Sequence, residues 1–482
     1  MFRLLALAST TVLVLYGCWP LGRYDDRAGG VRQHQARVKP FYHSVKTHDD
    51  LCVGGTSHSG YIGLEGDSAS VPKRAFFWYF QAQHDHESAP VILTIGGGPG
   101  SSGMANPLFG QSHCKVTENR TTVINRSAWS EHYNLVALDH PIGVGFSYGT
   151  RVNSSRAAAY DAYDFLVKFF RLFPMLSNNK LVLAGGSYGG VYVPHIATII
   201  HEQNTAVAAG RGLPGATFLN LEALMVSNPM SVSISNLPYY CRWALQQRCY
   251  YTDFYNASTC ATAFERLPFC LEAVQMAYMH DTVALRARAM DVCDNVYPDR
   301  IPGRSLENVN VRCDGTLGDC MPETVWAADF MNLPTTKATL GVPAHLNFTF
   351  VNRQVHEEFV AEGDMVQQAY LLYEPLLAAG YRLLHYIGKL DANCAWPGVL
   401  SMLRLIRSQY QSTFLNAPDL RWRGEDATVR AVGPGAGSFT YVLLDNAGHH
   451  VTGDQPELVK KILNHWVKNV PFELERGQRT TE

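Results

Sequence analysis

The chain has 482 residues, 46% of them hydrophobic, which is enough to bury a large core in one big α/β domain or in two domains. Its 40 Lys and Arg against 42 Asp and Glu leave a formal net charge of -2. Proteins that bind nucleic acids or anionic membranes usually carry a basic excess or stripe, so neither partner is expected here.

The first residues have the pattern of an export signal. Arg3 precedes an apolar run over residues 4–17 that is too short to cross a bilayer. We therefore expect residues 1–20 to form a signal peptide. No later stretch is apolar and long enough to span a membrane, so we expect a soluble mature chain that is secreted or delivered to a vacuole or lysosome.

Cysteines and glycosylation triplets agree with export. Of eleven Cys, removal of Cys18 with the signal leaves ten, an even set that indicates disulfides but leaves their pairing open. The triplet N-x-S/T accepts N-linked glycans in the eukaryotic secretory route. It occurs at Asn119, Asn125, Asn153, Asn256 and Asn347.

Short β-rich runs alternate with helical patterns along most of the chain. The runs predict strands at 75–80, 91–95, 134–138, 181–184, 222–226, 382–387 and 440–444, and helical patterns lie at 155–172, 190–203 and 456–469. This alternation favours an α/β fold with a mainly parallel sheet that helices cover on both faces. Residues 21–482 are therefore predicted to form a single domain.

Two stretches depart from that rhythm. Residues of about 230–345 are rich in Cys, Asp, Pro and Tyr, and we interpret them as a lid-like insertion above the sheet. The string HDH at 84–86 has residue types that bind metals, but two histidines and one Asp in a polar loop are more often solvated. We expect no metal and no cofactor.

The string LVLAGGSYGG, 181–190, carries the clearest chemical signal. Its G-x-S-x-G pattern centres on Ser187, and such glycines permit a strained strand-to-helix turn that exposes the serine hydroxyl. By itself the pattern is also compatible with a plain glycine-rich turn. A β-run before it and a helix after it are the confirming context, so we interpret Ser187 as a nucleophile.

A serine hydroxyl needs a base and a group that orients the base. In this kind of fold the acid and the histidine follow the serine, each in a loop after a late strand. Asp391 lies just beyond the run 382–387, and His449 lies just beyond 440–444. Either residue alone is readily explained as a turn cap or a locally bonded histidine, but both lie where a triad requires them.

A second glycine-rich turn, GGGPGSSG at 96–103, follows the run 91–95. It lacks the Lys of a phosphate-binding loop. An α/β-hydrolase places an oxyanion-binding N–H at such a turn, matched by the N–H of the residue after the nucleophile. We assign Gly98 and Tyr188 as the two donors.

Five motifs together resemble the serine carboxypeptidase family, in its fungal, secreted form. They are GGGPGSS at 96–102, PIGVGFSYG at 141–149, GGSYGGVYVP at 185–194, GKLDANC at 388–394 and AGHHVTGDQP at 447–456. The resemblance covers nearly the whole mature chain. It implies an α/β-hydrolase fold with a helical, disulfide-bonded insertion, a Ser-Asp-His triad, and release of C-terminal residues from peptides.

The sequence departs from the family pattern where the substrate's terminal carboxylate is held. The family's Asn before the turn is Gly96, and the Glu before the nucleophile is Gly186. The second Glu of the family corresponds to Gln111, or to Gly110 if the alignment shifts by one. Two acids in one site raise one pKa, so that a neutral carboxyl can bind a carboxylate in mild acid. That device is absent from the sequence.

The usual Met after the catalytic histidine is His450, and the usual Cys after the P-G is Ser101. Carboxylate recognition is then expected to pass to backbone N–H groups such as that of Gly97, to Gln111, or to His450. We also expect kcat/KM to lack the family's acidic optimum and to fall as His449 becomes protonated.

Three hypotheses follow. The first is a serine carboxypeptidase with altered end recognition, acting on peptides. The second is an acyltransferase or esterase that acts on a small acyl substrate or a carboxyl-blocked substrate. The third, a glycosylated binding protein without catalysis, is disfavoured by the intact triad. The sequence leaves the oligomeric state open.

Overall fold

The computed structural model describes residues 40–212, 215–230, 257–294, 296, 301–313 and 315–475. The expected signal peptide at 1–20, the acceptor Asn256, Cys241 and Cys249 lie outside the described residues.

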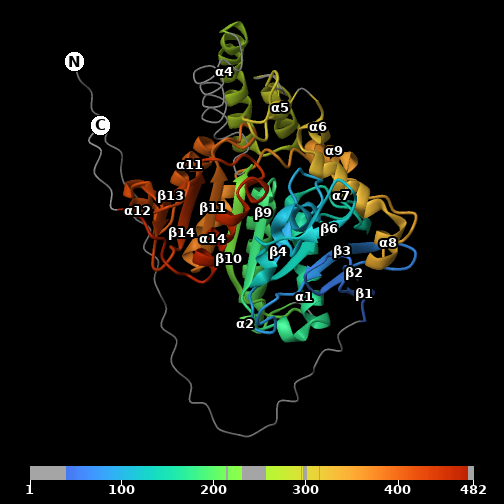
Figure 1. Ribbon diagram of the computed structural model, residues 1–482. Coiled ribbons are helices and arrows are strands. Elements are labelled where there is room, and N and C mark those ends of the chain that lie inside the picture. The colour runs from blue at the N-terminus through green and yellow to red at the C-terminus, as the bar shows by residue number, and fades with distance from the viewer. Residues whose placement is uncertain are drawn as a thin grey trace, which may run out of the picture. The chain divides into compact units, whose positions relative to one another are not determined.

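A large mixed sheet organises the described part of the chain (Figure 1). Its order is β1-β2-β3-β7-β4-β9-β10-β11-β14-β13-β12, with β8 paired to β3. The six strands from β7 to β14 in that order run parallel, and the strands on either side are antiparallel. Strands β5 and β6 form a separate hairpin. The strands are β1 (His43–His48), β2 (Ser57–Gly63), β3 (Lys73–Phe80), β4 (Val91–Ile95), β5 (Cys114–Val116), β6 (Thr122–Ile124), β7 (Asn134–Leu138), β8 (Tyr148–Gly149), β9 (Leu181–Ser187), β10 (Leu221–Pro229), β11 (Arg382–Gly388), β12 (Leu420–Arg421), β13 (Ala427–Val432) and β14 (Phe439–Leu444).

Helices pack against the sheet and extend beyond one end of it (Figure 1). They are α1 (Ser155–Leu172), α2 (Gly189–Ala208), α4 (Ala257–His280), α5 (Val283–Asp294), α6 (Leu317–Cys320), α7 (Pro322–Asn332), α8 (Pro334–Leu340), α9 (Arg353–Glu362), α10 (Tyr373–Ala378), α11 (Trp396–Leu405), α12 (Gln411–Asn416), α13 (Val451–Asp454) and α14 (Pro456–Val467). No described helix combines the length and the apolar character that crossing a membrane requires.

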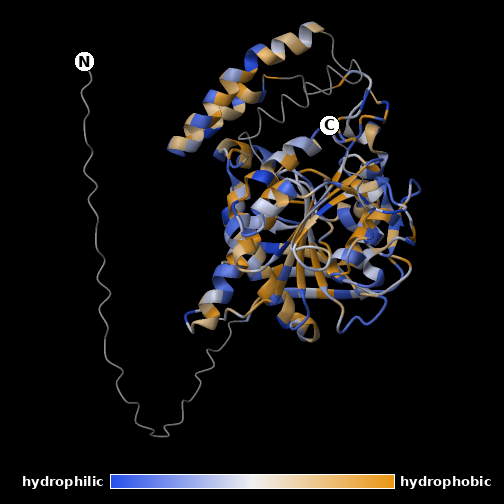
Figure 2. Cartoon of the chain, turned by 90° about the vertical axis from the view of Figure 1, so that its left-hand side faces the viewer, coloured by the Kyte–Doolittle hydropathy of each residue, from blue (hydrophilic) through white to orange (hydrophobic). Residues whose placement is uncertain are grey.

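The core consists of two apolar layers, one on each face of the sheet. Successive strand residues point to opposite faces, so Phe77 and Tyr79 of β3 join the cluster that contains α1 and α2, whereas Phe76 and Trp78 join the cluster that contains α14. Figure 2 shows the apolar strands between helices with hydrophilic outer faces. A sheet buried on both faces explains why its central strands are almost continuously hydrophobic.

The sequence predicted the central strands and three of the helices that cover them. Each expected strand lies within a strand of the structure, although β9 and β10 extend further, to Ser187 and Pro229. The three predicted helices correspond to α1, α2 and α14. The polar edge strand β1, with the sequence HSVKTH, was not predicted.

Described residues within 230–345 are largely helical. Helices α4 and α5 lie side by side (Figure 1), and a disulfide between Cys270 and Cys293 links them around a small apolar cluster of their own. Further disulfides join Cys52 to Cys114 and Cys313 to Cys320. The even cysteine count suggested disulfides throughout, but Cys394 is free and buried.

Candidate active site

The sheet topology brings three chemically active loops to one edge. Strands β9, β10, β11 and β14 are adjacent and parallel, so their carboxyl ends meet at the same edge. Ser187 ends β9, Asp391 follows β11, and His449 follows β14. Residues far apart in the sequence are therefore brought together by strand order alone.

Ser187 occupies a strained turn. Its φ is +56°, a left-handed value that is uncommon for a residue with a side chain. A Cβ at Gly185 would lie 3.2 Å from the Cα of Gly189, so the glycines on either side of the serine let strand and helix approach closely. This local geometry is the strained strand-to-helix turn that the G-x-S-x-G pattern predicts.

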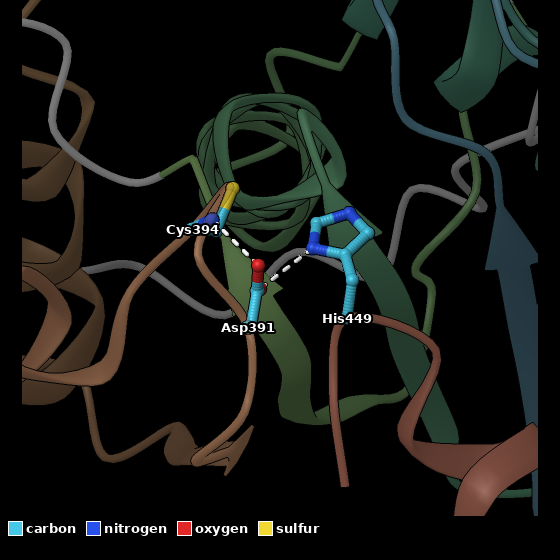
Figure 3. A group of neighbouring side chains, drawn as sticks. All are labelled: Asp391, Cys394 and His449. Carbon is cyan, nitrogen blue, oxygen red and sulfur yellow. Dashed lines mark hydrogen bonds and ion pairs between the residues drawn. The ribbon is translucent and has the colours of Figure 1, made fainter. Parts of the chain in front are cut away.

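Asp391 is buried and fully engaged as a hydrogen-bond acceptor. Its Oδ1 accepts from the backbone N–H groups of Asn393 (2.7 Å) and Cys394 (2.9 Å). Its Oδ2 accepts from the Asn228 side-chain amide (2.7 Å) and from His449 Nδ1 (2.7 Å) (Figure 3). These four donors fix this carboxylate in place.

The bond from His449 Nδ1 to Asp391 fixes the histidine tautomer that has a free Nε2 when the ring is neutral. Burial disfavours the imidazolium form, but the carboxylates of Glu307 and Asp391 and hydrogen bonds to Asp391 and Cys394 outweigh it, so the pKa of His449 is raised well above 6.5. The ring is therefore a strong base that is readily protonated.

One cavity joins most of the predicted site residues, although Asp391 and Tyr188 are not among the residues that line it. It is lined by Gly97, Gly98, Gln111, Ser187, His449 and His450, among others. The structure records no hydrogen bond between Ser187 Oγ and His449. Nε2 instead faces Glu307 Oε2 at 3.7 Å. Catalytic hydrogen bonds of this kind are often long without substrate and shorten when it binds.

The two glycine-rich turns meet beside the serine. A Cβ at Gly97 would lie 2.8 Å from Ser187 Cβ and 3.0 Å from the Tyr188 backbone nitrogen, so only glycine fits there. The Tyr188 ring is buried, and its hydroxyl donates to Asp364 Oδ2 at 2.6 Å. This bond anchors the start of α2, and the Tyr188 backbone nitrogen lies close to Gly97, which lines the cavity.

The positions that differ from the family pattern also lie at the cavity. A Cβ at Gly96 would lie 2.2 Å from the Ser101 carbonyl oxygen, so the present backbone excludes Asn there. A Cβ at Gly186 would lie 2.6 Å from the Ser227 hydroxyl, which occupies the space above it. Gln111 is buried, and its Oε1 has no hydrogen-bond partner among the described residues.

His450 lies beside the base. Its ring is 5.3 Å from that of His449 and meets Phe109 edge-on. Desolvation first, and then the charge of His449, lower the pKa of His450 to about 3, which favours the neutral ring although 35% of its side chain is exposed. It can offer a neutral hydrogen-bond donor or acceptor to a ligand, but no charge.

Sequence reasoning missed two site residues, Asn228 and Glu307. Asn228 bonds Asp391 and also accepts from the Gly388 N–H at 2.9 Å, which ties the ends of β10 and β11 together. Its position at the end of a strand between the nucleophile and acid strands was a usable signal. Glu307 gave no such signal, because it approaches His449 from the interval 230–345.

Asp391, Cys394 and His449 place one potential metal-binding atom each within 4.8 Å of one another. The carboxylate is already filled by N–H donors. Burial raises the pKa of Cys394 to about 11, which disfavours the thiolate that metals prefer. This chemistry fits a hydrogen-bonded Asp–His pair rather than a metal site.

The glycosylation triplets have different environments. Asn119, Asn153 and Asn347 are exposed. The side chain of Asn125 is buried, and its Nδ2 donates to the carbonyl oxygens of Gly110 (2.7 Å) and Ser112 (2.8 Å). A glycan on that nitrogen would displace both bonds.

A parallel sheet with a strained serine turn and a buried Asp–His pair at its carboxyl edge has the architecture of an α/β-hydrolase of the serine type. The family model for serine carboxypeptidases matches residues 48–469, and the chain belongs to that family. The expected fold and the expected activity class, a serine-type peptidase that removes C-terminal residues, are thereby confirmed.

Known proteins agree with this assignment. The chain is 27% identical to carboxypeptidase Y homolog A of Paracoccidioides lutzii over 452 residues, which cover 92% of this chain and 79% of that protein. It is 26% identical to the homolog of Podospora anserina, with 90% and 77% covered. The solved structure of Kex1(delta)p, a prohormone-processing carboxypeptidase from Saccharomyces cerevisiae, has a similar fold with a TM-score of 0.70, 20% identity, and coverage of 86% of this chain and 92% of that one.

Proposed function

We propose that Ser187, His449 and Asp391 hydrolyse the last peptide bond of a substrate through an acyl-enzyme. Ser187 Oγ bonds to the acyl carbon while its proton passes to His449 Nε2. The imidazolium is stabilised by Asp391, which lies 2.7 Å from Nδ1. The observation that best supports this proposal is the buried Asp–His pair at the cavity that Ser187 lines.

The negative oxygen of the tetrahedral intermediate needs N–H donors, which we propose to be those of Gly98 and Tyr188. Neither N–H has a hydrogen-bond partner among the described residues, and Gly97 lets the two turns approach. When the intermediate collapses, the leaving amine takes the proton from Nε2. A water molecule then repeats the sequence and releases the acyl group.

We propose that Gln111 takes over part of carboxylate recognition, with the Gly97 N–H and a neutral His450 alongside. Gln111 Oε1 has no hydrogen-bond partner among the described residues, so no bond at that oxygen prevents the side chain from turning its NH₂ group toward a carboxylate. The acid pair of the family is missing here, because residue 186 is Gly and residue 111 is Gln.

The second candidate activity is that of an esterase or acyltransferase on a small or carboxyl-blocked acyl substrate. Gly96 and Gly186 favour this second activity, since no side chain at these two positions can bind a free carboxylate. The triad chemistry would be unchanged, and only the acceptor or leaving group would differ.

Further expectations from the sequence extend this proposal. They are a signal peptide at 1–20, a single domain over 21–482 with an insertion at about 230–345, passage through the secretory pathway to the exterior or a vacuole, and glycans on exposed Asn119, Asn153 and Asn347. Peptides are the expected partners.

Matched peptides test the proposal. We expect an N-blocked dipeptide with a free C-terminus to be cleaved with release of its last amino acid, and the same peptide as a C-terminal amide to be cleaved more slowly, which mass spectrometry can follow. Turnover of the amide and of simple esters without any release from the free acid would support the esterase reading instead.

A further inference from the structure

A short segment around Glu307, residues 306–309, lies across both catalytic loops. The Ala392 N–H donates to the Leu306 carbonyl oxygen at 3.0 Å, and the Val309 N–H donates to the Leu390 carbonyl oxygen at 3.0 Å. These two bonds attach the segment to the loop that contains Asp391.

The same segment is attached to the histidine loop. The His449 N–H donates to the Glu307 carbonyl oxygen at 2.6 Å, and the Asn308 side-chain amide donates to Asp454 Oδ2 at 3.0 Å. A Cβ at Gly448 would lie 2.2 Å from the Glu307 carbonyl oxygen, so glycine at this position permits the contact. The backbone thus fixes where the Glu307 side chain begins.

The two oxygens of the Glu307 carboxyl group have different surroundings. Oε1 accepts from the Asn393 side-chain amide at 3.1 Å. Oε2 is buried, has no hydrogen-bond partner among the described residues, and lies 3.7 Å from His449 Nε2 and 3.8 Å from His450 Nε2. The unsatisfied oxygen therefore faces the nitrogen that must accept the serine proton.

Few other charged groups lie near Glu307 and His449. Asp391 faces His449 from the opposite side of the ring, and the Cys394 thiol lies next to that pair. The neutral His450 is the remaining titratable side chain next to His449. Among the described residues that line the cavity, Glu307 is the only acid and no Lys or Arg is present. The cationic group that can offset the charge of Glu307 among these lining residues is therefore the imidazolium of His449.

We propose that Glu307 is a positioning residue that controls the protonation of His449, so that the catalytic imidazole lies between two carboxylates, Asp391 at Nδ1 and Glu307 at Nε2. This inference rests on the proposed triad. An ionised Glu307 stabilises the imidazolium and makes His449 a stronger base. It also keeps Nε2 protonated, and unable to accept the serine proton, up to a higher pH than Asp391 alone would.

The titration of Glu307 agrees with such a coupled pair. Burial and the nearby Asp391 raise the pKa of Glu307, against the opposite effects of His449 and the Asn393 bond. The charge of Glu307 and the charge of His449 therefore stabilise each other, and the two groups titrate as a coupled pair. Catalysis in the acid range depends on whether His449 Nε2 is protonated.

Glu307→Gln tests this control, because it keeps the acceptor for Asn393 and all the backbone bonds. The rate of Ser187 labelling by a fluorophosphonate, measured against pH, reports the state of His449 without any need for peptide binding. In Glu307→Gln we expect the labelling rate to reach half of its high-pH plateau at a pH about one unit or more below that of the wild type. In the acid range this corresponds to a labelling rate, relative to the plateau, about tenfold higher than in the wild type. The plateau at high pH should not rise.

Two matched variants separate charge from structure. Asn308→Ala removes a bond from the same segment but no charge, so we expect its midpoint to stay at the wild-type pH. Glu307→Asp keeps the charge and should remain closer to the wild type than Glu307→Gln. A slower reaction at every pH with an unmoved midpoint in Glu307→Gln would overturn the proposal and indicate a purely structural role.

A wild-type measurement decides the matter if a variant does not fold. In a histidine-labelled sample, the NMR signal of His449, assigned from its loss in His449→Gln, should titrate well above pH 6.5, and titration at or below pH 6.5 would overturn the inference. If Ser187 were not labelled at all, the proposed function would fail, whereas this titration would still test whether the carboxylates around His449 stabilise its protonated form.

Discussion

Ser187→Ala is expected to abolish turnover while the protein remains folded. Removal of the nucleophile from a serine triad costs about 10⁶-fold in kcat, since the other groups act only through it. The residue ends β9 at the surface of the cavity and its side chain makes no hydrogen bond to a described residue, so its loss should leave packing intact. Release of C-terminal amino acids, measured alongside the thermal unfolding midpoint, checks both parts.

The matched control is Ser177→Ala, which alters an exposed serine that bonds only to the Pro174 carbonyl oxygen. Its activity should equal that of the wild type. Residual turnover in Ser187→Ala close to the wild-type rate would mean that another nucleophile carries the reaction.

Asp391→Asn is expected to lower kcat by about 10⁴-fold, because an amide in place of the carboxylate disturbs the tautomer of His449. Both carboxylate oxygens receive hydrogen bonds: Oδ1 from two backbone N–H groups, and Oδ2 from Asn228 and His449. An NH₂ group would face donors in either orientation. If it faced Nδ1, it would favour the ring with hydrogen on Nε2, which cannot accept the serine proton.

Steady-state kinetics and the labelling rate of Ser187 should fall together in Asp391→Asn, because both depend on the same base. We also expect reduced stability, since a buried acceptor is replaced by a group that leaves donors unsatisfied. A variant that labels and turns over like the wild type would show that the Asp391–His449 bond is irrelevant to catalysis.

The central strands were predictable because a sheet covered on both faces requires continuous apolar runs, as in β4 and β7. The edge strand β1 could not be found this way, because its residues are mostly exposed and polar. Helices α4 and α5 depend on a disulfide and a small cluster of their own, neither of which leaves a strong local pattern.

The positions of Ser187, Asp391 and His449 could be derived from the sequence, since each directly follows a recognisable strand and parallel strands end at one edge. Glu307 could not, because its approach to His449 depends on the folding of residues 306–309 over two distant loops. The burial of Asn125 was equally hidden, since its partners lie in the turn around Gly110 and Ser112.

The account requires that one particular alcohol be the nucleophile, and covalent trapping tests this most directly. After reaction of the full chain with a fluorophosphonate, peptide mapping by mass spectrometry should find a single added phosphonyl group, on Ser187, and Asp391→Asn should slow its formation. A folded protein that stays unlabelled, or that carries the group on another residue, would contradict the account.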